Sequence, residues 1–305
     1  MSVSVTSARA PPHYLFGILP PLFWAGNFFA ARMFHEAIPP IQMSFWRWVL
    51  ALAILLVAGL PLLRRNLTIL RREWLYLAFL GAIGVTAFNC LIYVALHHTT
   101  VVNASLINSL MPMLTILIAF ALIGDRLSLR QVGGLAVCLA GAMVVIARGD
   151  LAQLAGLEIN PGDLLVLCGV CFWALYTVLI RWKPSKLPLL AFLTVTTTFG
   201  VVFHLPFLVW ELGQTGPFAP TLTNLAVLIY LAVFPSLLAY IFWNRAVAAF
   251  GPGRTSMFMY LMPIFGTLLA MAFLGESFQL FHLAGLILIF GGIALATLPV
   301  RRARP

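Results

Sequence analysis

The chain has 305 residues, of which 62% are hydrophobic and only 9% are charged. Soluble domains are about 45–50% apolar and about 25% charged, so this composition excludes a water-soluble enzyme, a nucleic-acid-binding protein and a disordered regulator. The formal net charge of +10 is therefore interpreted as a signal of membrane orientation and not of a polyanionic partner. The composition predicts a polytopic protein embedded in a lipid bilayer.

Ten continuous apolar stretches are each long enough to cross about 30 Å of hydrocarbon as a helix. In chain order they cover 13–33, 39–62, 74–95, 100–122, 129–147, 162–182, 188–210, 223–245, 253–274 and 279–299. Loop-forming residues separate them, such as Pro39-Pro40, Asn160-Pro161-Gly162 and Gly251-Pro252-Gly253. Because the runs are continuous and do not alternate, they predict helices. The predicted fold class is an all-α membrane protein with ten transmembrane helices.

The basic residues predict the orientation of the spans. Fifteen of the eighteen lysines and arginines fall on one side, and only Arg32 and Arg148 fall on the other. The remaining base, Arg47, lies inside the second span. Cytoplasmic loops carry the excess of basic residues, so both termini are predicted to be cytoplasmic.

The two halves of the chain resemble each other. The run Leu110-Met111-Pro112 recurs as Leu261-Met262-Pro263, a shift of 151, and Phe23-Trp24-Ala25 recurs as Phe172-Trp173-Ala174, a shift of 149. Since each half has five spans, an odd number, the second half must enter the membrane from the opposite side. Such inverted repeats are typical of secondary transporters, whose substrate site lies near the midplane between the repeats.

The repeat gives the predicted domain organisation. A cytoplasmic tail (1–12) precedes the first five-helix repeat (13–147), and a periplasmic connection (148–161) leads to the second five-helix repeat (162–299) and a cytoplasmic tail (300–305). Glycines at matching positions in the fifth and tenth spans predict close helix contacts. These contacts could join the two halves or two subunits of a homo-oligomer, and the sequence leaves both alternatives open.

The chain resembles the EamA-type drug/metabolite transporter superfamily. The features that carry the resemblance are the five-plus-five spans, the segment from Trp24 to Asn27, Arg47, the matched Pro112 and Pro263, and the Gly-Asp and Gly-Glu turns. Within the superfamily the chain looks most like the bacterial aromatic amino acid exporters of the YddG type, on overall impression and not on a substrate-diagnostic motif. The resemblance implies a bacterial inner-membrane exporter of amino acids or other small metabolites.

Residues for ion coupling are not evident in the sequence. All eight acidic residues lie at span ends or in loops, whereas proton relays and sodium sites usually keep a carboxylate at mid-span. His204 lies well inside a span, and we interpret it as a polar residue between helices, with the transport pathway as the alternative. No cofactor or metal site is predicted, and Cys168-x-x-Cys171 is interpreted as two small apolar residues.

Arg47 is the charged residue inside a span, and at a rise of 1.5 Å per residue it lies about 12 Å from the outer end. A charge at that depth is costly unless it is paired or hydrated. The structural interpretation is snorkelling or bonding to backbone carbonyls. The functional interpretation is contact with a substrate carboxylate.

Polar and aromatic residues at repeat-related positions predict the substrate site. Asn89 and Tyr93 are four residues apart and share a helix face, and a shift of 151 leads to Tyr240 and Asn244, the same pair in swapped order. The predicted substrate-binding residues are Trp24, Asn27, Arg47, Asn89, Tyr93, Asn108, Trp173, Tyr176, Tyr240 and Asn244. The structural alternatives are lipid contact for the aromatic residues and bonds between helices for the asparagines.

The predicted function is facilitative export of small amphipathic metabolites, above all amino acids and among them aromatic ones, by alternating access. The alternative within transport is a proton-coupled multidrug or quaternary-cation exporter, for which a buried acid is expected. The alternative of another class is a membrane-embedded enzyme or receptor. An enzyme should show clustered catalytic groups at one membrane face, which the sequence lacks, and a receptor would not need the inverted repeat. The predicted partners are a small-molecule substrate and lipid, without nucleic acid.

Overall fold

The computed structural model describes residues 14–34, 36–95, 98–99, 104, 107–125, 128–147, 149–150, 160–274 and 279–297. Within these ranges the chain consists of helices and turns, with no strand. Eight continuous helical stretches within the described residues are long and apolar enough to cross a membrane. Three of them, Leu67–Ala95, Leu222–Phe250 and Pro252–Phe273, each combine several of the elements named below. Two shorter apolar helices cover Met111–Ile123 and Leu280–Ala296. The protein is therefore an all-helical, multi-pass membrane protein.

The helices of the first half are α1 (Tyr14–Phe34), α2 (Pro40–Arg64), α3 (Leu67–Gly81), the π-helical segment η1 (Ala82–Ala87), α4 (Phe88–Ala95), α6 (Met111–Ile123) and α7 (Leu129–Ile146). Those of the second half are α9 (Pro161–Trp182), α10 (Leu189–Thr215), α11 (Leu222–Leu231), the π-helical segment η2 (Ala232–Leu238), α12 (Ala239–Phe250), α13 (Pro252–Met257), the 3-10 segment η3 (Phe258–Leu261), α14 (Met262–Leu274) and α15 (Leu280–Thr297).

The same series of elements occurs in both halves. Adding 151 to the bounds of α6 gives those of α14, and the same shift relates α7 to α15. The two π-helical segments also match, because η1 shifted by 151 falls on residues 233–238 within η2. Pro39 and Pro188, which precede α2 and α10, have the same backbone angles, φ −55° and ψ 143°.

The fourth predicted span, 100–122, is not one continuous helix in its described part. Ser109 and Leu110 form a turn, and α6 begins only at Met111. Pro112 has no N–H with which to continue the preceding helix, but it is well tolerated in the first turn of a new one. The related position in the second half lies in η3, just before Pro263. Residues 100–103, 105 and 106 lie outside the described residues.

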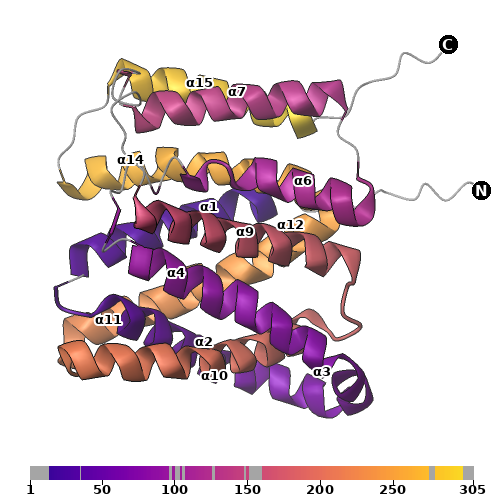
Figure 1. Ribbon diagram of the computed structural model, residues 1–305, viewed down its shortest axis with the longest axis vertical. Helices are drawn as coiled ribbons and strands as arrows, with labels where there is room; N and C mark the ends of the chain where they lie inside the picture. The colour runs from indigo at the N-terminus through magenta and orange to yellow at the C-terminus, as the bar shows by residue number, and fades with distance from the viewer. Residues whose placement is uncertain are drawn as a thin grey trace, which may run out of the picture.

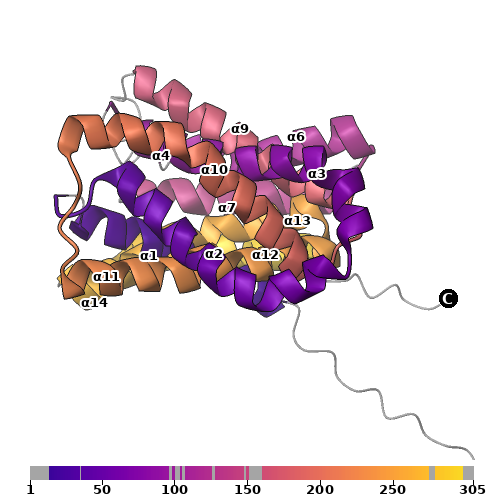
Figure 2. The ribbon, with the colours of Figure 1, turned by 90° about the horizontal axis from the view of Figure 1, so that it is seen from below.

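Two layers of helices lie at opposite edges of the molecule. Figure 1 shows α7 and α15 side by side at the top, and α2, α10 and α11 at the bottom, with α1, α9 and α12 between them. Figure 2, seen from below, brings α2, α3, α10 and α11 toward the viewer. The central helices come from both halves, so residues on α1, α9 and α12 meet inside the protein.

Glycines bring α7 and α15 into backbone contact. A Cβ atom on Gly134 would lie 2.6 Å from the carbonyl oxygen of Gly292, and a Cβ on Gly292 would lie 2.6 Å from the carbonyl oxygen of Gly134. Gly141 and Gly285 approach each other in the same reciprocal way, at 2.9 and 3.0 Å. The glycine faces of α7 and α15 therefore contact each other within one chain, which is the first of the two alternatives that the sequence left open.

Replacing Gly292 with alanine should lower the melting temperature of the detergent-purified protein. The added methyl group would press on the facing backbone, and overpacking of this kind costs about 1–3 kcal/mol. The neighbouring Gly291 is the matched control, because a Cβ there meets no atom within 4 Å. Gly291→Ala should leave the melting temperature unchanged or raise it, since alanine is the better helix former. Equal melting temperatures for the two variants would contradict this packing.

A buried carboxylate holds the start of α2 against α10. Glu211, 5% exposed, accepts hydrogen bonds from the backbone N–H groups of Ile41 (2.9 Å) and Gln42 (2.7 Å). The first N–H groups of a helix have no partner within the helix, and a negative charge is favourable beside them. Glu211 therefore has a structural role, and it fixes the helix that carries Arg47.

Candidate substrate-binding site

Seven aromatic side chains from five helices pack against one another where the two halves meet. They are Trp24 on α1, Trp48 on α2, Phe88 on α4, Trp173 and Tyr176 on α9, and Tyr240 and Trp243 on α12, and we call them the aromatic cluster. The Tyr240 ring lies 4.9 Å from Trp48 and 5.3 Å from Trp173, centroid to centroid. Edge-to-face and offset pairs at these distances are favourable beyond the area that they bury.

The π-helical segments supply backbone acceptors to side chains of the opposite half. The Tyr240 hydroxyl donates to the carbonyl of Gly84 in η1 at 2.5 Å. Trp24 Nε1 donates to the carbonyl of Pro235 in η2 at 3.0 Å. Pro235 lacks an N–H and so removes one bond from the helical ladder, which favours a local irregularity there. Both segments thus lie directly beside the aromatic cluster.

Arg47 is buried beside the aromatic cluster and bridges the two halves. Its side chain is 2% exposed, Nη2 donates to Asn89 Oδ1 at 2.5 Å, and Nη1 donates to Ser236 Oγ at 2.8 Å. The guanidinium carbon lies 5.1 Å from the centroid of the Trp48 ring. Both hydrogen-bond partners are neutral side chains, and in the part of the chain that the structure describes the buried guanidinium forms no bond to a backbone carbonyl. Within the described chain, the side-chain dipoles of Asn89 and Ser236 and the face of the Trp48 ring stabilise its positive charge.

Three buried N–H donors in this region lack an acceptor within the described chain. They are Nε of Arg47, Nε1 of Trp48 and Nε1 of Trp173. Buried polar groups are normally satisfied, and each exception calls for an explanation such as a missing ligand. Donors that include a guanidinium suit an acceptor-rich anionic group, and a carboxylate is the simplest.

The structure connects seven of the ten predicted residues through hydrogen bonds and ring contacts: Trp24, Arg47, Asn89, Trp173, Tyr176, Tyr240 and Asn244. In particular, Asn244 Nδ2 donates to the Tyr176 hydroxyl at 3.2 Å, and Asn89 joins the group through Arg47, whose guanidinium lies over the Trp48 ring.

The other three predicted residues, Asn27, Tyr93 and Asn108, make no hydrogen bond or ring contact with this group in the described part of the chain. Asn27 and Tyr93 are buried, with Asn27 Oδ1 and the Tyr93 hydroxyl unpartnered, and Asn108 is half-buried. Of the swapped Asn/Tyr pattern, Asn89 and Tyr240 therefore lie in one region, connected through Arg47 and Trp48, whereas no hydrogen bond or ring contact joins Tyr93 to Asn244 in the described chain.

Sequence reasoning missed Trp48, Phe88, Trp243 and Ser236. Helical spacing could have indicated two of them, because Trp243 lies three residues after Tyr240 and Ser236 lies four residues before it, on the same face. The contact of Ser236 with Arg47 depends on how α2 packs against η2, and no pattern within a single helix indicates that packing.

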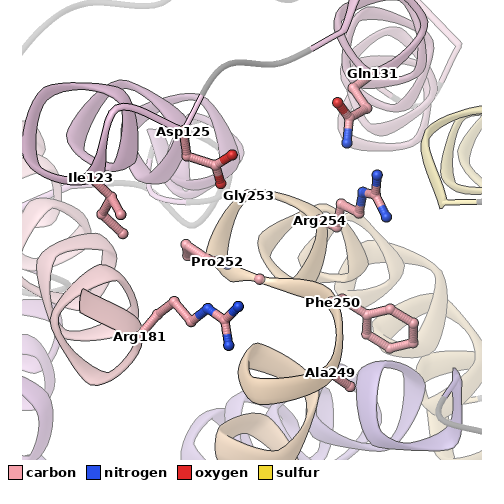
Figure 3. Close-up of a pocket in the computed structure, with 10 residues that line it drawn as sticks. Ile123, Asp125, Gln131, Arg181, Ala249, Phe250, Pro252, Gly253 and Arg254 are labelled. Carbon is pink, nitrogen blue, oxygen red and sulfur yellow. The ribbon is translucent and has the colours of Figure 1, made fainter. Parts of the chain in front are cut away.

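A cavity of about 440 Å³ lies apart from the aromatic cluster, where the ends of α6, α9 and α12 meet the starts of α7 and α13 (Figure 3). It is lined by Ile123, Asp125, Gln131, Arg181, Ala249, Phe250, Gly251, Pro252, Gly253 and Arg254. In this conformation the rings of the aromatic cluster pack directly against one another.

The apolar helices and the matching halves place the chain in the class of multi-pass membrane proteins. It belongs to the EamA-like transporter family, whose model matches residues 12–147 and 160–298. The expected resemblance to this superfamily is thereby confirmed. A crystal structure with 23% sequence identity superposes with a TM-score of 0.77 over 96% of this chain and 99% of the other, which shows the same fold.

Several curated relatives are transporters by name. The chain is 29% identical to the uncharacterized transporter YyaM of Bacillus subtilis, over 92% of each chain. It is 28% identical to a probable terminal-alkyne amino-acid exporter of Streptantibioticus cattleyicolor, over 91% of each chain. It is 27% identical to the uncharacterized inner membrane transporter YedA of Escherichia coli, over 93% of this chain and 90% of the relative. These names do not specify aromatic amino acids.

Proposed function

We propose that the protein is a secondary carrier that exports small amphipathic metabolites, above all amino acids with apolar or aromatic side chains. The observation that carries the proposal is the buried Arg47, whose partners are neutral, beside the unsatisfied donors of Trp48 and Trp173 and the rings of the aromatic cluster. A substrate carboxylate would accept from these donors, and its apolar body would pack among the rings. The relative named as a probable amino-acid exporter supports this substrate class.

The proposed architecture has ten transmembrane helices in two inverted five-helix repeats, 13–147 and 162–299. The matching series of elements in the two halves supports it, and the distribution of basic residues supports cytoplasmic termini. The proposed location is the bacterial inner membrane, as the name of one relative suggests.

The bonds that join the two halves support a mechanism of alternating access. Trp24 to Pro235, Tyr240 to Gly84 and Arg47 to Ser236 each link the first half to the second. Opening the protein toward either side of the membrane must break some of these three hydrogen bonds. Contacts with a bound substrate then replace the broken bonds. The π-helical segments sit at these links, where a short irregular stretch of helix can change its hydrogen bonding at low cost.

The topology predicts opposite accessibility for two positions in the described helices. Cysteines at Thr68, near the start of α3, and at Gln214, near the end of α10, in a background without the four native cysteines, should be labelled from opposite faces. A membrane-impermeant maleimide applied to intact cells should reach position 214 and leave position 68 unlabelled until the cells are opened. Labelling of both from outside would contradict the ten-span arrangement.

The transport assay that tests the proposal is counterflow in proteoliposomes. We expect radiolabelled L-phenylalanine to accumulate in vesicles preloaded with unlabelled L-phenylalanine, with little change when a pH gradient is imposed. The physical reason is that both ring nitrogens of His204 are engaged, by Ser44 at 3.2 Å and by the Gly200 carbonyl at 3.1 Å, so this histidine serves helix packing. Severalfold stimulation by an acidic exterior would instead favour the proton-coupled exporter.

A further inference from the structure

We propose that the cavity at the ends of α6, α9 and α12 is a second binding site, which takes the zwitterionic head of an α-amino acid before the substrate reaches the aromatic cluster. This inference rests on the proposed function, because it assigns a docking site to the same class of substrate. Its residues share none with the aromatic cluster.

Three charged side chains reach this cavity from three segments of the chain. Asp125 follows the end of α6, Arg181 lies in the last turn of α9, and Arg254 lies in α13 (Figure 3). Gly124, with φ of 70°, ends α6 in a left-handed conformation that places Asp125 at the cavity. All three side chains are exposed, so they are accessible to a solute from the aqueous side.

The charges of these side chains are opposite in sign to the two charged groups of an α-amino acid, with two arginines for the carboxylate and Asp125 for the ammonium group. Arg181 donates from Nη1 to the carbonyl of Ala248 at 3.3 Å, and within the described chain Asp125 forms no ion pair with either arginine. Two guanidinium groups can hold a carboxylate, because arginine matches its planar geometry. The Asp125 carboxylate can accept hydrogen bonds from the ammonium group. An inorganic anion would gain from the arginines but be repelled by Asp125, so the set favours a zwitterion.

The size and position of the cavity agree with this assignment. Its volume of about 440 Å³ lies in the range of about 300–1,000 Å³ that is typical of small-molecule sites. Phe250 adds an apolar wall for a side chain. Ile123, Asp125 and Gln131 come from the first half and the remaining lining residues from the second, so the cavity changes shape whenever the halves move against each other. It lies at the face that the basic residues predict to be cytoplasmic, where export begins.

The test measures counterflow of L-phenylalanine as a function of its concentration in the full-length protein. The double variant Arg181→Gln/Arg254→Gln should raise KM by about three- to tenfold, because exposed charge-assisted contacts are individually modest, while the maximal rate stays within twofold. Asp125→Asn should raise the KM for L-phenylalanine. It should leave the inhibition by 3-phenylpropanoate unchanged, because this compound lacks the ammonium group. Arg71→Gln is the matched control, since Arg71 is an exposed arginine on α3 outside the cavity.

The possible outcomes distinguish a failure of the proposed function from a failure of the second binding site. Wild-type protein without L-phenylalanine counterflow would overturn the proposed function and this inference together. Normal counterflow with an unchanged KM in the cavity variants, or an equal rise of KM in Arg71→Gln, would overturn the inference alone. The assay is repeated in vesicles of phosphatidylcholine with and without phosphatidylglycerol. If the effect of the double variant disappears without the anionic lipid, the arginines bind lipid phosphate and the docking site is wrong.

Discussion

Arg47→Gln is expected to weaken binding of L-phenylalanine to the purified protein by about ten- to a hundredfold. Arg47 is buried, its two hydrogen-bond partners are neutral, and its Nε is unsatisfied. A carboxylate bound there would receive charge-assisted hydrogen bonds worth about 1.5–3 kcal/mol, and 1.4 kcal/mol corresponds to a factor of ten. Equilibrium binding of the radiolabelled amino acid measures the change.

The structural interpretation of Arg47 predicts a different result. If the guanidinium only ties α2 to Asn89 and Ser236, its loss should lower the melting temperature and leave the affinity of the folded protein unchanged. Arg47→Lys keeps the charge without the planar fork, so under our account it should retain part of the affinity. Arg71→Gln, an arginine outside the site, should match wild type in both measurements.

Tyr240→Ala should weaken binding of L-phenylalanine by about three- to tenfold while the protein still inserts into the membrane. The Tyr240 ring contacts Trp24, Trp48, Trp173 and Tyr176, so its removal takes away a ring face at the centre of the cluster. An aromatic pair contributes about 0.5–1.5 kcal/mol beyond the area that it buries. The same binding assay, on samples matched for folded protein, measures the loss.

Two further variants distinguish the contribution of the Tyr240 ring to binding from that of its hydroxyl and from general packing. Tyr240→Phe removes only the hydroxyl that donates to Gly84, so it should retain the ring contacts and most of the affinity. Tyr93→Ala removes a buried tyrosine that makes no hydrogen bond or ring contact with the cluster in the described chain. Wild-type affinity is expected for Tyr93→Ala. Equal losses in Tyr93→Ala and Tyr240→Ala would mean that the affinity depends on general packing and not on the aromatic cluster.

The helical segments were predictable from the sequence because apolar length and loop chemistry determine them. The expected span 39–62 is α2, Pro40–Arg64, and the expected span 162–182 is α9, Pro161–Trp182. At the start of α9 the signal is local, since Asn160 and Asp163 form a reciprocal capping box before and within the first turn. The expected third span, 74–95, begins seven residues earlier at Leu67, because a helix can continue past the apolar region with charged residues exposed.

The irregular elements were not predictable in this way. The π-helical segments η1 and η2 lie inside uniformly apolar runs, where hydropathy does not distinguish one helical form from another. Tertiary contacts accompany them, since Tyr240 and Trp24 bond to their carbonyls from the other half, and Pro235 favours an irregularity in η2. The break before Pro112 was signalled by the proline, but a proline is compatible with either a kink or a new helix.

The repeat pattern indicated which helices carry the predicted site residues, and whether those residues bind substrate stays a prediction. Residues on α1, α4, α9 and α12 lie in one region, through the ring contacts of Trp24, Trp173 and Tyr240 and through the bond of Arg47 to Asn89. The repeat pattern did not fix the rotation of each helix about its axis. Tyr93 lies one helical turn beyond Asn89 and makes no hydrogen bond or ring contact with the cluster in the described chain.

The central claim is that the buried Arg47 and the aromatic cluster recognise a carboxylate attached to an apolar body. One competition experiment tests this claim most directly. Wild-type protein is equilibrated with radiolabelled L-phenylalanine and challenged with 3-phenylpropanoate, which lacks the amine, or with phenethylamine, which lacks the carboxylate. Our account predicts that 3-phenylpropanoate displaces the label and that phenethylamine does not at the same concentration. Displacement by phenethylamine but not by 3-phenylpropanoate would contradict it and would identify the cluster as a site for cations.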